Sequence, residues 1–235
     1  MTTYIEGDIH DVIKILGTNS VDFIYTDPSF GTTKAKWDKP LDWKTLFPEM
    51  WRVLKPNGVI CLYASMPFTY ELLQYEKPKY HYSWCKNIAT GHLSAKYQPM
   101  RCMEEIFIYY KKRGTYNPQM EGTEYRKKRL VKYGSKENSY WGKAKQEEHF
   151  NGKGEKIYET EEGGHTGRYP KTFKNWPIRK DKTGITRTDE QIDYFIKTYS
   201  NEKDTILDMT AHCEYVGNRC LELKRNYIGV DLEFK

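Results

Sequence analysis

Apolar and polar positions along the first 110 residues follow the pattern of a protein in which strands alternate with helices. Residues 22–26 form a short apolar run that ends abruptly at Asp27-Pro28, as a buried parallel strand does. Residues 41–54 carry apolar side chains at helical spacing, and the Pro and Gly of segment 55–58 end that helix. Residues 4–5 are a short apolar stretch. The remaining elements predicted here are strands at 59–64, 81–84 and 105–110, the last two at the sheet edge, and helices at 12–16 and 70–75.

The C-terminal residues repeat this alternation. The sequence Thr188-Asp189-Glu190-Gln191 has the form of a capping box and opens a helix that runs to Tyr199. A strand at 204–207, a helix at 215–224 and a strand at 226–230 follow. Strands that alternate with helices in this way predict an α/β fold, a doubly wound and mostly parallel sheet.

Positive charge is concentrated between these two parts. Residues 111–182 hold 19 Lys and Arg against 10 Asp and Glu, a net charge of +9, whereas the whole chain has 38 against 32. The Lys and Arg suit a phosphate backbone and the interleaved Tyr and Trp suit stacked bases, although the scarcity of aliphatic residues equally suits a solvated loop. We therefore expect one domain made of residues 1–110 and 183–235, with 111–182 as a basic insertion.

Composition excludes several classes of protein. No run of about 18 apolar residues is present, which excludes a membrane span. The first ten residues lack the basic and apolar parts of a secretion signal. The five Cys form no CxxC pair, which argues against a disulfide framework or a structural zinc site. We expect a cytoplasmic protein with no metal and no membrane contact.

Candidate chemistry lies at three strand ends, where open α/β sheets bind their ligands. Asp27 could accept a hydrogen bond from an amine and Phe30 offers a flat face for a base, although Asp-Pro alone is more often a simple turn. Asp231 follows Asp208 by 23 residues, close to the spacing of an acidic residue that binds ribose hydroxyls. The loop at 208–217 has one glycine, Gly217, which is a weak cofactor signal.

The order of these elements resembles the β-class of S-adenosylmethionine-dependent DNA methyltransferases, which modify exocyclic amino groups. In that family an Asp-Pro-Pro-Tyr motif comes first, the target-recognition segment lies in the middle, and the cofactor loop lies near the C-terminus. The shared landmarks, in chain order, are Glu6-Gly7-Asp8, 19–22, 34–38, 53–58, 65–68, 84–87, 196–202 and 225–231.

The resemblance implies an enzyme that transfers a methyl group to the exocyclic N6 of an adenine flipped out of double-stranded DNA. Asp27 and the Pro28 carbonyl would accept hydrogen bonds from the target amine, Ser29 would complete the motif, and Phe30 would stack on the base. The basic insertion would be the target-recognition region, and a homodimer is a further expectation because dimers are frequent in the family.

The resemblance also implies contacts with S-adenosylmethionine and with DNA. Asp8 would contact the adenine of the cofactor, Asp231 its ribose, and Asp208 would lie near its methionine part. Thr210 and Gly217, in and after the same loop, complete the expected cofactor contacts. The expected DNA contacts are Lys34, Lys36, Arg126, Lys127, Lys128 and Arg129.

Departures from the family pattern leave alternatives open. Ser29 and Phe30 stand where Pro and Tyr are usual, while Asp27 favours adenine, because cytosine-N4 enzymes more often have Ser there. The loop at 208–214 lacks the two central glycines, so a left-handed backbone position would cost about 1 kcal/mol or more. Arg187 stands where the family often has Lys. The alternatives are an inactive or partner-dependent DNA-binding homologue, and a cytosine-N4 or RNA-directed enzyme.

Overall fold

The computed structural model describes the 235-residue chain except for residues 33–34, 36–37, 133–156, 182–183 and 235. The chain divides into two compact units. Met1–Gln119 and Lys171–Lys235 form the first unit, and Met120–Pro170 form the second. The second unit is thus shorter than the insertion expected at 111–182, and residues 171–181 belong to the first unit.

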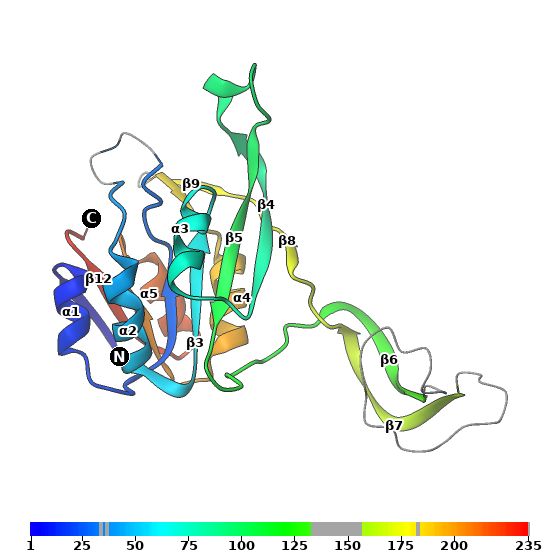
Figure 1. Ribbon diagram of the computed structural model, residues 1–235. Coiled ribbons are helices and arrows are strands. Elements are labelled where there is room, and N and C mark those ends of the chain that lie inside the picture. Colours follow the sequence, from blue (N-terminus) through cyan, green and yellow to red (C-terminus); the bar gives the residue numbers. More distant parts are fainter. Residues whose placement is uncertain (33–34, 36–37, 133–156, 182–183, 235) are drawn as a thin grey trace. The chain divides into compact units, whose positions relative to one another are not determined.

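The first unit is built on an eight-stranded sheet with the order β1-β12-β11-β2-β3-β5-β4-β8 (Figure 1). The first five strands in this order, β1, β12, β11, β2 and β3, run parallel to one another. Strand β5 is antiparallel to both of its neighbours, β3 and β4, and β8 is parallel to β4. Their bounds are β1 Thr2–Glu6, β2 Val21–Thr26, β3 Leu54–Ala64, β4 Tyr80–Thr90, β5 Arg101–Tyr109, β8 Phe173–Asn175, β11 Thr205–Asp208 and β12 Asn226–Asp231. The mostly parallel sheet confirms the predicted fold class.

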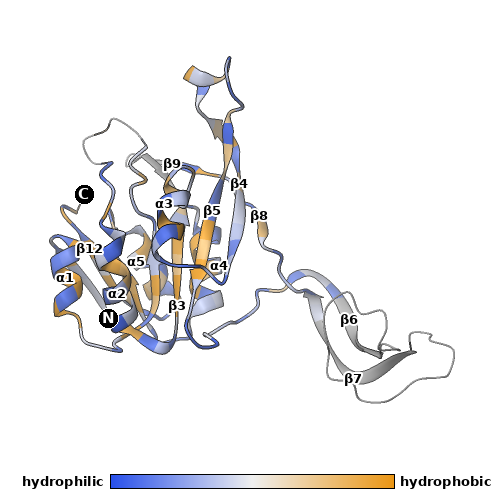
Figure 2. Ribbon diagram, in the orientation of Figure 1, coloured by the Kyte–Doolittle hydropathy of each residue, from blue (hydrophilic) through white to orange (hydrophobic). Residues whose placement is uncertain are grey.

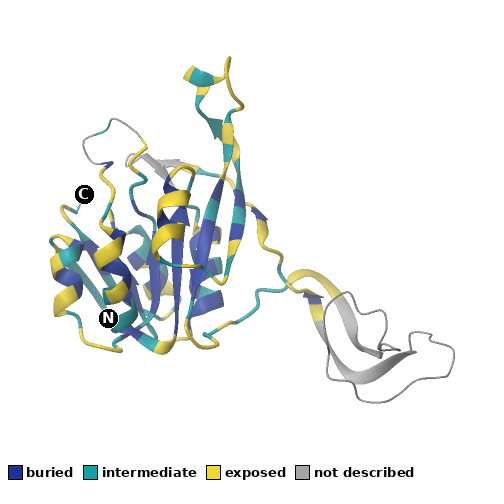
Figure 3. Ribbon diagram, viewed as in Figure 1, coloured by how far each residue is buried: buried dark blue, intermediate teal, exposed yellow. Residues whose placement is uncertain are grey.

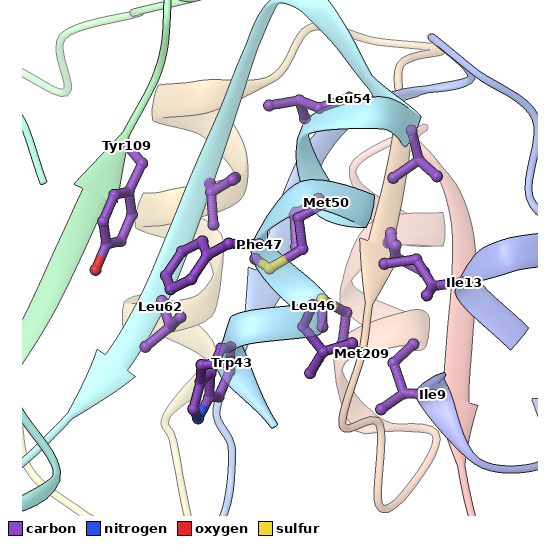
Figure 4. Packing of buried hydrophobic residues seen from close by; sticks show 14 of the residues in the cluster. Ile9, Ile13, Trp43, Leu46, Phe47, Met50, Leu54, Leu62, Tyr109 and Met209 are labelled. Atoms are coloured by element: carbon purple, nitrogen blue, oxygen red, sulfur yellow. The ribbon is translucent and has the colours of Figure 1, made fainter. Parts of the chain in front are cut away.

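Helices pack on both faces of this sheet, because the strands are apolar on both sides (Figure 2). One face is covered by α1 (Ile9–Ile15), α2 (Trp43–Val53) and α3 (Phe68–Tyr75), and the other by α4 (Asp189–Tyr199) and α5 (Tyr215–Glu222). Figure 4 shows the first of these cores, in which Leu46 and Met50 of α2 face the sheet. Figure 3 shows the buried strands and the exposed outer sides of the helices. Within the described residues, no helix is both long and apolar enough to cross a bilayer.

Three local predictions were wrong. β3 begins at Leu54, not at residue 59, because Leu54 already pairs with Val21 and segment 55–58 bulges out before Val59 pairs with Phe23. The hairpin of β4 and β5 does not lie at the edge, since β8 pairs beyond it. Thr188 does precede α4, but its side chain makes no capping hydrogen bond; acidic residues in the first turn favour this helix end instead.

The second unit is a two-stranded antiparallel ribbon of β6 (Glu121–Lys132) and β7 (Ile157–Arg168). Gly167 has a left-handed φ of +84°, and a Cβ there would lie 2.7 Å from the Glu121 carbonyl oxygen. Residues 120–170 hold 11 Lys and Arg against 9 Asp and Glu, a net charge of only +2. Most of the +9 of segment 111–182 therefore belongs to the stretches 111–119 and 171–182. The remaining two strands, β9 (Arg179–Asp181) and β10 (Gly184–Thr186), form a short hairpin before α4.

Candidate active site

The candidate site lies where β2, β11 and β12 end at one edge of the sheet. Asp27 follows β2 directly, and its backbone N–H donates to Thr210 Oγ1, in the loop after β11, at 3.2 Å. The Thr210 hydroxyl also lies 3.2 Å from the Thr26 hydroxyl. Thr210, expected to contact a cofactor, thus joins the loop of the candidate catalytic motif to the loop after β11, and its cofactor contact stays a prediction.

Arg187 binds the Asp27 carboxylate through two hydrogen bonds. Nε donates to Oδ2 at 2.8 Å, and Nη2 donates to Oδ1 at 2.7 Å. The same Nη2 lies 3.0 Å from Glu104 Oε2, and Lys86 Nζ donates to Glu104 Oε1 at 2.7 Å. These four groups, Lys86, Glu104, Arg187 and Asp27, alternate in charge and are called the Asp27 charge chain below.

Two aromatic rings lie against the Arg187 guanidinium. Its Cζ lies 4.6 Å from the ring centroid of Tyr63 and 4.5 Å from that of Trp84, and both rings are fully buried. The Arg187 side chain is 12% exposed and that of Asp27 is 32% exposed. Burial raises the pKa of Asp27, and the guanidinium acts against this. A carboxylate has about four acceptor positions, so Asp27 can accept a further hydrogen bond from its exposed side.

The rest of the motif forms a tight turn. Pro28 is buried, and Ser29 and Phe30 are partly buried. The Phe30 ring stacks on Phe68 of α3 with ring centroids 5.5 Å apart. Gly31 has a φ of +64°, and its N–H donates to Asp38 Oδ1 at 2.7 Å. One face of Phe30 is therefore already packed, and stacking of a flipped base on this ring stays a prediction.

The glycine-poor loop folds without the strain that a missing glycine would bring. No residue from 208 to 214 has a positive φ, and His212 and Glu214 are exposed. Asp208 shapes the loop, because its Oδ1 accepts from the Thr210 N–H and its Oδ2 from the Tyr227 hydroxyl, both at 3.1 Å. Burial raises the pKa of Asp208 to about 7. Contact of Asp208 with a cofactor stays a prediction.

Gly217, also expected to bind the cofactor, lies in α5 against two tyrosines. A Cβ on Gly217 would lie 2.2 Å from the Tyr4 hydroxyl and 2.9 Å from the Tyr227 ring. The absence of a side chain is therefore required by the packing of α5 on the sheet. This packing accounts for Gly217 whether or not it also contacts a ligand.

Asp8 and Asp231 lie near each other after neighbouring strands. The Gly7 N–H donates to the Asp231 backbone oxygen at 2.8 Å. Asp8 caps α1 by accepting from the His10 N–H at 2.9 Å, and its side chain is 53% exposed. Asp231 is partly exposed, and its Oδ1 accepts from the Glu233 N–H at 3.0 Å. Both carboxylates are accessible to a polar ligand at this edge.

Buried polar atoms at the start of α4 adjoin Arg187. Thr188 Oγ1 and both amide atoms of Gln191 are buried and have no hydrogen-bond partner among the described residues. Such groups are rare in folded proteins. These buried atoms lie on the side of the sheet that α4 covers, whereas the accessible carboxylates of Asp8 and Asp231 at the strand ends are the groups that fit the amino and hydroxyl groups of S-adenosylmethionine.

The family pattern included Arg187, and it included Lys86 within the landmark 84–87 without a role, whereas Glu104 was not among the expected site residues. The available signal for Glu104 is its position next to the predicted strand at 105–110; the structure places it within β5, which pairs with strands on both sides. Nothing local linked these residues to Asp27, since β2, β4, β5 and the segment before α4 come together only in the folded sheet.

The expected DNA-binding residues are placed only in part. Lys34 and Lys36 lie outside the described residues. Arg126, Lys127, Lys128 and Arg129 lie on β6, where the structure describes their backbone and not their side chains. Their DNA contacts stay predictions.

Comparison with known proteins identifies the family of this site. A family model described as DNA methylase, covering N6 and N4 enzymes, matches residues 21–235. The type II methyltransferase M.HpaI of Haemophilus parainfluenzae is 26% identical over 236 residues, which cover 94% of this chain and 67% of that protein.

Solved structures share the fold. M1.HpyAVI in its complex with SAM has a TM-score of 0.57 at 16% identity, covering 99% of this chain and 93% of that one. The cytosine-N4-specific PvuII DNA methyltransferase has a TM-score of 0.64 at 9% identity, covering 99% and 82%. With the Asp27 loop and the loop after β11 joined at the carboxyl ends of the strands of a Rossmann-like sheet, the chain belongs to the N6/N4 DNA methylase family.

Proposed function

We propose that this DNA methyltransferase uses S-adenosylmethionine to methylate the N6 amino group of adenine in duplex DNA. The observation that carries the choice of adenine is Asp27, an acidic residue at the first position of the motif, whose side chain is 32% exposed. Asp27 would accept a hydrogen bond from the amino group, and the Pro28 carbonyl would accept a second. These two acceptors would orient the nitrogen toward the methyl donor.

The residues at the strand ends fit the cofactor. Asp231 would hold ribose hydroxyls and Asp8 the adenine amino group, because both carboxylates are accessible. When bound, S-adenosylmethionine supplies the methyl group. The chain itself would position the base, and Arg187 would keep Asp27 ionised and fixed in orientation.

The ribbon of the second unit is our candidate for sequence recognition. The major groove of DNA accepts a two-stranded β-ribbon, and β6 carries Arg126, Lys127, Lys128 and Arg129 in succession. Because β7 contains Glu159, Glu161 and Glu162, we expect β6 to be the strand that approaches the phosphates.

The experiment is a methylation assay with isotope-labelled S-adenosylmethionine and a mixed duplex DNA, followed by digestion to nucleosides. N6-methyladenine is the expected product. N4-methylcytosine would overturn the adenine assignment and leave the family unchanged. Calorimetric titration with the cofactor, with and without DNA, accompanies the assay; no binding and no methylation would favour an inactive or partner-dependent DNA-binding homologue.

A further inference from the structure

The hairpin of β4 and β5 continues beyond the sheet as an arm made of residues 86–103. The two strands pair regularly from Tyr80 with Ile108 to Cys85 with Met103, after which the register shifts and Thr90 pairs with Arg101. Residues 86–89 thus stand opposite the single residue Cys102, and this irregularity separates the regular part of the hairpin from the arm. A short 3-10 helix, η1 (His92–Ser94), follows Gly91 at the turn (Figure 1).

The arm leaves the sheet at the carboxyl ends of the parallel strands, where Asp27 also lies. β4 runs in the same direction as β2 and β3, because it is antiparallel to β5 and β5 is antiparallel to β3. The end of β4 therefore lies at the carboxyl edge of the sheet. At the base of the arm, Lys86 belongs to the Asp27 charge chain, and Asn87 Oδ1 accepts from the Ile178 N–H at 2.9 Å. These contacts fix the base of the arm relative to Asp27.

The tip of the arm combines exposed apolar groups with positive charge. Leu93 is 100% exposed and Tyr97 is 89% exposed. Lys96 and Arg101 are also exposed, and no Asp or Glu occurs from residue 77 to residue 103. The adjoining stretch 171–182 adds five Lys and Arg against one Asp. Two large exposed apolar side chains next to positively charged ones suit a binding partner that has both negative charge and flat apolar faces.

We propose that this arm is a second DNA-contacting element, separate from the β6–β7 ribbon, that binds the duplex beside the base held at Asp27. Leu93 and Tyr97 contact base or sugar faces, and Lys96 and Arg101 contact phosphates. Apolar side chains that press between base steps help to unstack them, which extrusion of a target base requires. This inference rests on the proposed action on duplex DNA, and it names the surface that engages the DNA next to the reacting base.

The test measures the affinity of the full chain for a labelled random-sequence duplex by fluorescence anisotropy, across a range of salt concentrations. Lys96→Glu is expected to weaken binding about threefold to tenfold and to lower the slope of log affinity against log salt by about one. The double variant Leu93→Asn/Tyr97→Ser is expected to weaken binding about tenfold with an unchanged slope. All three side chains are exposed, so the fold should be retained, which thermal unfolding verifies.

The matched control variants change residues near the opposite ends of the strands, away from the arm. Ile15→Asn changes an apolar side chain that is 77% exposed at the end of α1, and Lys77→Glu makes the same charge change before β4. Both should bind DNA like the unaltered protein.

Arm variants that bind as tightly as the controls would overturn the proposal. So would a loss of dimers in light scattering at unchanged DNA affinity, since the arm would then contact a second copy of the chain. If the unaltered protein bound no duplex at all, the proposed function would fail together with the arm. If the unaltered protein binds the duplex and the arm variants bind it equally well, only the proposal about the arm is refuted.

Discussion

Arg187 and Asp27 are 160 residues apart in the sequence, and two hydrogen bonds of 2.7 and 2.8 Å join the guanidinium to the two carboxylate oxygens. The guanidinium lies against the rings of Tyr63 and Trp84 and beside Glu104, so groups other than Asp27 also hold it in place. Asp27 is consequently held in one orientation before any substrate binds. Arg187 is thus a positioning residue for Asp27, and its effect can be measured.

Arg187→Lys keeps the positive charge, but a lysine ammonium cannot reproduce the two parallel hydrogen bonds that the planar guanidinium donates to Asp27. We expect the rate of methyl transfer at saturating cofactor to fall about tenfold or more, with cofactor affinity unchanged. Steady-state kinetics and calorimetric titration measure the two quantities. An unaltered rate would show that the bidentate contact does not position Asp27.

Arg187→Gln removes the cation that opposes the effect of burial on the pKa of Asp27. The pKa of Asp27 should then rise further, so a smaller fraction of the carboxylate is ionised at neutral pH. The acid limb of the pH–rate profile should move to higher pH, with activity recovering as pH increases. Arg52→Gln is the control, because the Arg52 guanidinium also joins separate segments but donates to the backbone carbonyls of Ile13 and Leu16 instead of the Asp27 carboxylate. That control should leave the profile in place.

Asp27→Asn retains the shape of the side chain and removes its charge. We expect methyl transfer to fall by about a hundredfold or more, because an acceptor aimed at the reacting amine is lost. DNA affinity and the circular dichroism spectrum should stay the same. Activity close to that of the unaltered protein would exclude Asp27 as the catalytic acceptor.

Asp208→Asn should change how stability depends on pH. The pKa of Asp208 is about 7 in the folded protein and 3.8 for the free side chain, so between these values the folded state holds a proton that the unfolded state has lost. The free energy of unfolding of the unaltered protein should therefore decrease as pH rises from about 4 to about 7, and then level off. The contribution is at most about 4 kcal/mol.

Urea unfolding at pH 5 and pH 8 measures this effect. The variant should lack the contribution of Asp208, so it should gain stability relative to the unaltered protein between pH 5 and pH 8. Equal pH dependence in both proteins would mean that Asp208 is ionised throughout. Tyr227→Phe is a useful companion, because it removes the hydroxyl that donates to Asp208 Oδ2.

Gly217→Ala should destabilise the fold by about 1–3 kcal/mol, because the new Cβ meets the Tyr4 hydroxyl and the Tyr227 ring. Tyr4→Phe removes the nearer of these atoms. In the double variant, the cost of Gly217→Ala should be smaller than in the single variant, as urea unfolding can measure. If the double variant shows simple additivity, the Tyr4 contact is not what excludes a side chain at Gly217.

Local patterns were sufficient for the core of the fold. Short apolar runs and helical periodicities predicted most strands and helices, because burial on both sheet faces requires continuous apolar strands and one-sided helices. They also placed Asp27, Asp208 and Asp231 at strand ends, where parallel strands bring such residues to one edge. Net charge was less informative, since the basic segment divides between the ribbon and two stretches of the first unit.

Only the tertiary structure decided how Asp27 is held and what the glycine-poor loop requires. The Asp27 charge chain joins residues from four separate segments, and no spacing in the sequence relates Lys86 or Glu104 to Asp27. The loop after Asp208 avoids left-handed backbone because hydrogen bonds from Thr210 and Tyr227 shape it. Sequence patterns record periodic burial along one segment, whereas ion pairs and close packing depend on distances between segments that only the folded sheet sets.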